Sequence, residues 1–75
     1  MNDLDIWRKL PQKGYMYVYD DFEELAIKLY IIKGTIMCNF KRKGKEEKLG
    51  DITSAFIRES ICYGKEITKD EYDKL

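Results

Sequence analysis

Lys33 and Gly34 stand between two runs of strand-forming residues, at positions 25–32 and 35–42. Glycine adopts a positive φ angle at little cost, as a two-residue hairpin turn requires, so this pair predicts a tight β-hairpin. The turn also sets which residues of the two strands lie opposite one another. Three apolar pairs then share one face of the hairpin: Ile31 with Ile36, Leu29 with Cys38, and Ile27 with Phe40. A shift of one residue would turn this whole apolar face toward water, so the sequence specifies the register.

The opposite face of the hairpin is mixed in character. It carries Ala26, Lys28, Tyr30 and Ile32 on the first strand, opposite Lys41, Asn39, Met37 and Thr35 on the second. Antiparallel sheets commonly pack one face on a core and leave the other toward solvent. We therefore expect the apolar face to lie beneath a helix and the mixed face to lie outside.

A second Lys-Gly pair, at positions 43–44, predicts a further turn and a fourth strand. Counting from this turn places Leu49 opposite Cys38, on the apolar face. The same count places Glu47 opposite Phe40, where a charged residue fits badly. We therefore expect the fourth strand to be short or bulged.

The two ends of the chain predict short helices. Residues 3–10 repeat apolar side chains every three positions, with Asp3 as a cap and Pro11 just beyond the expected end. Near the other end, Thr68 and Glu71 have the spacing of a capping box, which predicts the start of a last short helix.

Residues 51–63 are compatible with a strand or a helix, and a helix fits better because the alternation expected of a strand is poor. Asp51 would cap this helix, and Gly64 stands where a helix-terminating glycine belongs. The side chains expected to face the sheet are Ile52, Ala55, Phe56 and Cys62, with Ile57 or Tyr63 at the edges.

Together these elements predict one α+β domain that spans residues 1–75. Its sheet is an antiparallel meander of three to four strands, with one face covered by the helix of residues 52–63. The first strand is expected at positions 15–19, and the short terminal helices are expected to pack at the margins.

The composition argues against an enzyme. The chain has no histidine, the commonest general base and metal ligand. Cys38 and Cys62 match no zinc-ligand spacing, and both fall at expected core positions. Acidic residues at 20–24 and 70–73 are typical of a turn and of the first turn of a helix, and neither group has the spacing of a calcium loop. We therefore expect no catalytic residue, no metal and no cofactor.

The sequence shows no sign of a membrane or secreted protein. Its first residues lack the basic patch and apolar run of a secretion signal. The longest apolar stretch, around positions 29–32, is far too short to span a bilayer. With only two cysteines, the chain is expected to be cytoplasmic, with free thiols and no membrane contact.

Basic and acidic residues balance at 14 each, so the total charge does not predict a broad nucleic-acid footprint. Basic residues nevertheless gather in the middle of the chain. The candidates for phosphate contacts are Lys28, Lys41, Arg42, Lys43 and Lys45. For the residues at the hairpin tip, an exposed turn whose charges protect a sheet edge is the better explanation, because Glu46 and Glu47 follow directly behind it.

Residues 15–19 alternate tyrosine with Met16 and Val18. If Met16 and Val18 join the core, the tyrosines lie on the outer face, beside the aromatic and methionine residues of the hairpin. In the opposite orientation the tyrosines are core residues and the patch disappears. Exposed aromatic patches are typical of interfaces. The candidate partner-binding residues are Tyr15, Tyr17, Tyr19, Tyr30 and Met37.

Two functions fit these features. The first is a small inhibitor or regulator that binds another protein, either a host protein or a second copy in a homodimer, through the aromatic sheet face or an open sheet edge. Small accessory proteins of phages and mobile elements often have this size and no catalytic residues. The second is a single-stranded nucleic-acid-binding protein that stacks bases on the tyrosines and holds phosphates at the basic hairpin tip. The balanced charge favours the first.

Overall fold

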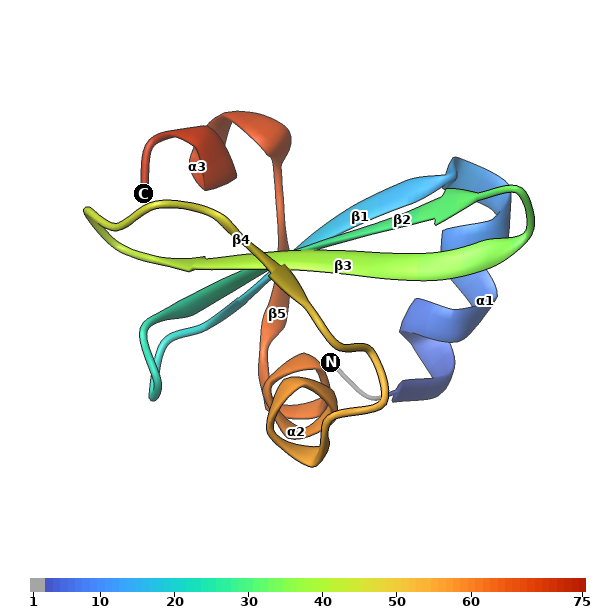
Figure 1. Cartoon of the computed structure of the whole chain (residues 1–75), viewed down its shortest axis with the longest axis horizontal. Helices are drawn as coiled ribbons and strands as arrows, with labels where there is room; N and C mark the ends of the chain where they lie inside the picture. Colours follow the sequence, from blue (N-terminus) through green and yellow to red (C-terminus); the bar gives the residue numbers. More distant parts are fainter. Residues whose placement is uncertain (1–2) are drawn as a thin grey trace.

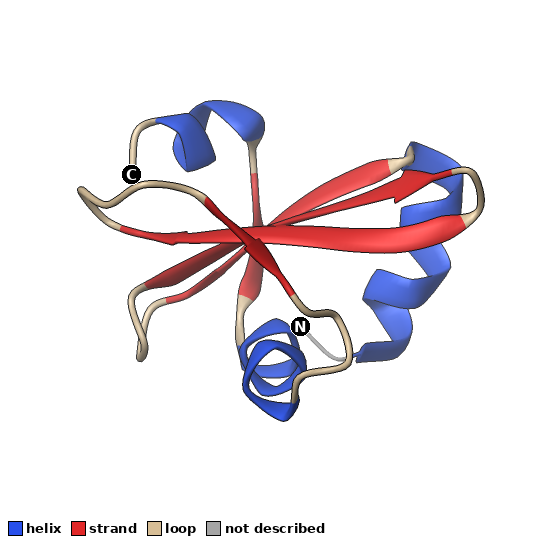
Figure 2. Cartoon of the chain, in the orientation of Figure 1, coloured by secondary structure: helices blue, strands red, loops and turns tan. Residues whose placement is uncertain are grey.

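A computed structural model describes residues 3–75 as one five-stranded antiparallel sheet with three helices packed against it (Figure 1; Figure 2). In chain order the elements are α1 (Asp3–Lys13), β1 (Tyr15–Asp20), β2 (Leu25–Ile32), β3 (Thr35–Arg42), β4 (Lys48–Gly50), α2 (Ala55–Tyr63), β5 (Lys65–Ile67) and α3 (Lys69–Asp73). The strands lie in the order β4-β3-β2-β1-β5. The predicted α+β class and the antiparallel order of the first four strands are confirmed.

The two faces of the sheet carry different helices. Figure 1 shows α1 and α2 on one side of the sheet, here called the inner face, and α3 on the other, the outer face. The expectation that α1 and α3 pack only at the margins is therefore wrong. Both faces are at least partly covered, because α1 adds apolar residues to the main core and α3 builds a second, smaller core.

The β2–β3 hairpin has the predicted bounds and register. Lys33 and Gly34 form its turn with φ angles of 50° and 77°, and two positive values are what a tight turn of this kind requires. Leu29 pairs with Cys38, and both side chains are fully buried on the inner face. Turn chemistry and the apolar pattern thus agree on one register.

The fourth strand is short, as expected, but its register differs by one residue from the expected one. Gly50 pairs with Cys38, and Leu49 pairs with Asn39 on the outer face. A Cβ atom at Gly50 would lie 2.8 Å from Cys38 Sγ and 3.0 Å from Phe40 Cδ1. The strand therefore places its one glycine at the crowded position, and the predicted burial of Leu49 is wrong.

The sheet has a fifth strand that the sequence pattern did not predict. β5 pairs with β1, with Ile67 opposite Tyr17 and Lys65 opposite Tyr19. Its three residues are too few to show the alternation by which a strand is recognised. β1 therefore lies inside the sheet, not at its edge.

The helix predicted over residues 51–63 is confirmed, but it begins later. Ser54 is its N-cap residue, while Asp51 accepts hydrogen bonds from the backbone and hydroxyl of Thr53 in the preceding turn, at 2.9 and 2.6 Å. The expected cap at Asp51 is therefore wrong. These hydrogen bonds lower the pKa of Asp51.

The face that α2 turns toward the sheet also differs from the expected one. Its buried residues are Ile57, Ser60 and Ile61, while Ala55 and Phe56 are exposed. These three residues have the i, i+3, i+4 spacing of a helix face. Because Ser60 is polar, the apolar pattern of the sequence did not indicate this face.

Gly64 ends α2 as predicted, but for a different reason. Its φ angle of −78° is open to any residue. A Cβ atom here would lie 2.6 Å from Val18 Cγ1 and 2.8 Å from the carbonyl oxygen of Ser60. Glycine therefore allows the end of α2 to approach β1 closely.

α1 continues beyond the expected end at Leu10, through Pro11 to Lys13. A proline lacks the N–H group that would bond one turn back, but here it lies in the last turn of the helix. The helix ends at Gly14, whose φ angle is 79° and whose N–H donates to the Leu10 carbonyl at 2.7 Å. The proposed Asp3 cap lies outside the side chains that the structure describes.

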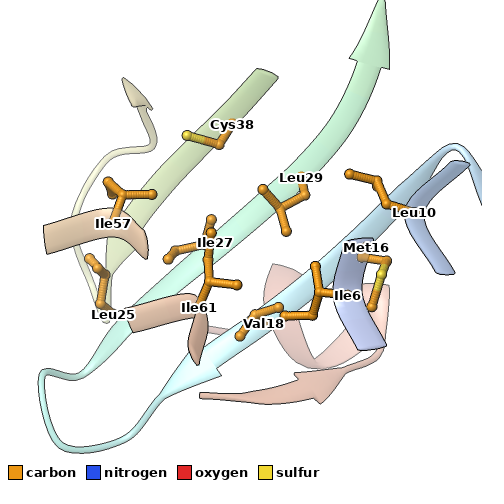
Figure 3. Close-up of a cluster of buried hydrophobic side chains, with 10 residues drawn as sticks. All are labelled: Ile6, Leu10, Met16, Val18, Leu25, Ile27, Leu29, Cys38, Ile57 and Ile61. Atoms are coloured by element: carbon orange, nitrogen blue, oxygen red, sulfur yellow. The ribbon is translucent and has the colours of Figure 1, made fainter. Parts of the chain in front are cut away.

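The main core fills the inner face beneath α1 and α2 (Figure 3). The strands supply its centre and each of the two helices adds a pair of side chains. Burial of such residues contributes about 1.5–3 kcal/mol for each large aliphatic side chain. The core consists of Ile6, Leu10, Met16, Val18, Leu25, Ile27, Leu29, Cys38, Ile57 and Ile61.

The predicted capping box at the start of α3 is confirmed. Thr68 Oγ1 accepts from the Glu71 backbone N–H at 3.1 Å, and the Glu71 carboxylate accepts from the Thr68 N–H at 3.0 Å. This helix has five residues, and Tyr72 is its only buried one. A helix this short depends on its cap and on that one contact.

We expect Thr68→Ala to lower the free energy of unfolding by about 1 kcal/mol, because the first turn of α3 loses its side-chain acceptor. Urea denaturation measures the change. Thr35→Ala is the matched control, since Thr35 is exposed beside the hairpin turn and should change stability by no more than about 0.5 kcal/mol. Equal effects of the two substitutions would contradict a stabilising cap.

Candidate protein-binding surfaces

β1 turns its tyrosines to the outer face. Met16 and Val18 are buried in the main core. Since successive residues of a strand point to opposite sides, Tyr15, Tyr17 and Tyr19 lie on the outer face. Of the two orientations that the sequence left open, the structure has the outward one.

The outward tyrosines are not all accessible, however. Tyr17 is only 6% exposed, because Tyr72 of α3 covers it at a ring-centroid distance of 5.0 Å. Tyr19 is half-buried against the same cluster, and Tyr15 alone is well exposed. The outward orientation therefore does not produce a patch of three exposed rings. The sequence pattern could not place α3 over this end of the sheet.

α3 covers only one half of the outer face. The other half, nearer the β2–β3 turn, has no helix over it in the described part of the chain (Figure 1). Tyr15, Tyr30 and Met37 pair side by side across three strands there. The Tyr30 hydroxyl donates to Asn39 Oδ1 at 2.6 Å, which fixes the ring across the surface. We call this surface the open half-face: it consists of Tyr15, Lys28, Tyr30, Ile32, Met37, Asn39 and Leu49.

The open half-face combines exposed apolar side chains with one cation. Leu49 is 68% exposed, and Ile32 and Tyr15 are about half-exposed. The Lys28 ammonium lies 5.7 Å from the centroid of the Tyr30 ring. Leu49 is the residue that sequence reasoning missed, because the expected β4 register placed it in the core. Only the steric demand opposite Cys38 could have indicated its true position.

The predicted phosphate contacts do not form one cluster. The Lys41 ammonium lies 4.4 Å from the Tyr72 ring centroid under α3, and the Arg42 guanidinium donates to the Glu23 carbonyl oxygen. Lys28 belongs to the open half-face, and Lys43 is exposed in the β3–β4 turn. The predicted residues are therefore spread over both faces and the turn.

Part of this set borders a hollow of about 340 Å³ at the β3–β4 turn. Its lining carries four basic residues and a single acidic one. A surface of this kind attracts phosphate groups and loses affinity as salt rises. We call it the basic hollow: it consists of Phe40, Lys41, Arg42, Lys45, Glu46 and Lys48.

A second hollow, of about 420 Å³, lies between the β1–β2 loop and α2. Sequence reasoning missed it, because the acidic loop was interpreted as a turn and the aromatic residues of α2 as core. The signals were a phenylalanine inside that acidic loop and aromatic residues seven positions apart on one helix face. We call it the aromatic–acidic hollow: it consists of aromatic Phe22, Phe56 and Tyr63, acidic Asp20, Asp21, Glu23 and Glu59, and Ser60.

The two thiols lie in different surroundings. Cys38 is fully buried, and burial raises the pKa of its thiol, with a further rise from the nearby Asp51 charge. A raised pKa disfavours the reactive thiolate. Cys62 is only half-buried, although it was expected to be a core residue.

Comparison with protein-family models, curated proteins and solved structures finds no match for this chain. No helix within residues 3–75 is long and apolar enough to cross a membrane. Among the side chains that the structure describes, at residues 6–75, no group of three or more cysteine or carboxylate side chains is placed to hold a metal ion.

Proposed function

We propose that this chain is a small protein-binding domain that contacts its partner through the open half-face. The observation that carries the proposal is the gathering of Tyr15, Ile32 and Leu49, all half-exposed or more, around Tyr30 and Met37. Tyrosine and methionine are enriched in protein interfaces, and large apolar patches on small proteins mark them.

The structure of the open half-face suits a rigid contact. Its residues lie on three central strands and on β4, so little conformational entropy is lost when a partner binds. The Tyr30–Asn39 hydrogen bond holds one ring in place before binding. A domain of this kind acts by occupying a surface of its partner, as an inhibitor or regulator does.

We expect Tyr15→Glu with Leu49→Glu to weaken partner binding at least about tenfold, because two charges would be buried without partners at the interface. Both positions are exposed, so the fold should persist. The measurement is affinity capture from a lysate of the native cells with quantitative mass spectrometry. Light scattering of the purified chain, at several concentrations, detects a second copy as the partner.

Gln12→Glu is the control, since Gln12 is exposed on α1 and belongs neither to the open half-face nor to either hollow. The control should retain the captured protein, or the dimer, that the double variant loses. Equal capture by the wild type and the double variant, with an unchanged molar mass, would contradict the proposal. So would a wild-type chain that captures nothing and stays monomeric.

A second candidate function is nucleic-acid binding, and the basic hollow is the observation that favours it. The same proteins can be titrated with a labelled single-stranded oligonucleotide. Binding through the basic hollow would fall steeply between about 50 and 200 mM salt and would weaken in Lys45→Gln with Lys48→Gln. No binding at about 50 mM salt would exclude this function.

A further inference from the structure

The aromatic–acidic hollow lies apart from the open half-face. The β1–β2 loop and α2 build it at one end of β2, whereas the open half-face lies on the outer face, toward the β2–β3 turn at the other end (Figure 1). A ligand in this hollow would therefore contact the protein independently of a partner on the sheet. The aromatic and acidic side chains of its lining indicate the chemical class of that ligand.

The aromatic residues of the hollow are unusually exposed. Phe22 is 89% exposed and Tyr63 is 80% exposed, and Phe56, at 43%, also belongs to the lining. Leaving such rings in water forgoes the free energy of their burial. Aromatic rings on two separate segments that border one hollow offer flat surfaces to a ligand between them.

The charge of the hollow has one sign. Four of its lining residues are acidic, and none of the lining residues is basic. The Arg42 guanidinium comes near, but it donates to the backbone carbonyl of Glu23 and not to a carboxylate of the lining. Carboxylates beside aromatic rings favour a cation, because a cation is attracted both by their charge and by the faces of the rings.

Two buried polar groups border the same hollow. Asp20 is 5% exposed, and its Oδ1 accepts from the backbone N–H groups of Phe22 and Glu23 at 3.1 and 3.4 Å. Its second carboxylate oxygen has no hydrogen-bond donor among the side chains that the structure describes, at residues 6–75. Ser60 is 2% exposed, and its hydroxyl has no hydrogen bond to the described part of the chain either. Buried polar groups are normally hydrogen-bonded. A ligand with N–H or O–H donors would therefore complete the hydrogen bonding of the Asp20 carboxylate and the Ser60 hydroxyl.

We propose that the aromatic–acidic hollow binds an arginine side chain presented by a basic segment of a protein. A guanidinium is a planar cation that stacks on aromatic rings and carries five N–H donors for carboxylate and hydroxyl oxygens. A lysine ammonium matches the charge but does not stack, and a quaternary ammonium cannot donate to Asp20 or Ser60. The volume of about 420 Å³ accommodates one such side chain with its flanking backbone.

The test uses the full chain labelled with nitrogen-15 and a capped peptide of alternating glycine and arginine. A matched peptide carries citrulline, which keeps the shape of arginine without its charge. We expect the arginine peptide to shift the amide signals of residues 20–23 and 56–63, and the citrulline peptide to bind at least about tenfold more weakly. A lysine peptide should fall between the two.

Variants of the hollow separate this site from general attraction to acidic residues. Phe22→Ala with Tyr63→Ala keeps every carboxylate and should weaken the arginine peptide at least about fivefold, since stacking is lost. Tyr15→Ala with Leu49→Ala is the matched control on the open half-face and should leave the peptide affinity unchanged. A control variant that still binds the peptide yet no longer captures a protein partner would show that the two surfaces act separately.

Three results would overturn the proposal. The arginine peptide could shift no signal, or only signals outside the two segments. It could bind no more tightly than the citrulline peptide. It could keep its affinity when the rings of Phe22 and Tyr63 are removed, which would mean that the two most exposed rings do not contribute to binding.

Discussion

Replacing Leu29 by alanine is expected to lower the free energy of unfolding by ~2–5 kcal/mol. Leu29 is fully buried at the centre of the main core, opposite Cys38 on the neighbouring strand. The substitution removes its contacts and leaves a cavity that the surrounding strands cannot close. A domain of 75 residues is stable by only ~4–11 kcal/mol, so the loss would be a large share of the total.

Urea denaturation followed by the fluorescence of Trp7 measures this effect, because Trp7 is the single tryptophan and packs against the core. Leu49→Ala is the matched control: the same side chain is removed from an exposed position of the same sheet. It should change stability by no more than about 0.5 kcal/mol. A loss below about 1 kcal/mol for Leu29→Ala would mean that the inner face is assigned wrongly.

The β2–β3 register could be predicted because its determinants are local. Lys33 and Gly34 supply the turn, and the apolar residues on either side of it lie on one face only in that register. The capping box of Thr68 and Glu71 is local in the same sense, since both members lie within one turn of α3. Neither prediction required knowledge of the rest of the fold.

The β4 register could not be predicted, because it depends on a contact between strands. The loop between β3 and β4 is longer than a two-residue turn, so it does not fix which residues of the two strands pair. The pairing is decided by the lack of space for a Cβ atom against Cys38 and Phe40, which favours glycine at position 50. β5 is a similar case, since its three residues pair with β1 only because α2 returns the chain to that edge. In both, tertiary packing determines the outcome.

The binding surfaces show the same division. Strand alternation predicts that Tyr15, Tyr17 and Tyr19 share one face of β1, and the hairpin register predicts the pairing of Tyr30 with Met37. Alternation alone does not decide which face of the sheet the tyrosines occupy. The burial of Tyr17 depends on Tyr72, from a helix near the other end of the sequence. The aromatic–acidic hollow was missed for the same reason, since its rings come from two segments that only the fold brings together.

Replacing Tyr72 by alanine is the second substitution with a large expected effect. Tyr72 is the one buried residue of α3, and its ring packs on Tyr17 and Ala26 in the small outer core. Lys41 places its ammonium 4.4 Å from the ring centroid, and the Tyr72 hydroxyl donates to Glu47 Oε1 at 2.6 Å. The variant loses all of these contacts at once, so we expect a loss of ~3–5 kcal/mol, as for other buried aromatic residues.

The loss should be accompanied by a local change at α3. With no other buried side chain, α3 should detach from the sheet in Tyr72→Ala, and its amides should exchange with solvent much faster than in the wild type. Hydrogen exchange of residues 69–73 and urea denaturation measure the two effects. Tyr63→Ala is the matched control, because Tyr63 is an exposed tyrosine on another helix. Unchanged exchange in Tyr72→Ala would mean that α3 is held by other contacts.

Tyr72→Phe separates the hydroxyl from the ring. It should cost only about 0.5–1.5 kcal/mol, because the ring stays buried and Glu47 is exposed and can be rehydrated. Burial, and then the hydrogen bond to Glu47, raise the pKa of Tyr72 above its ordinary value of 10.0. The folded state therefore holds this proton more tightly than the unfolded state, so the contribution to stability is complete below pH 10 and is lost as the pH rises above it. Above pH 10 the free energy of unfolding should therefore fall less steeply with pH in Tyr72→Phe than in the wild type. An equal fall in the two proteins, measured by urea denaturation at several pH values, would contradict the burial of this hydroxyl beneath α3.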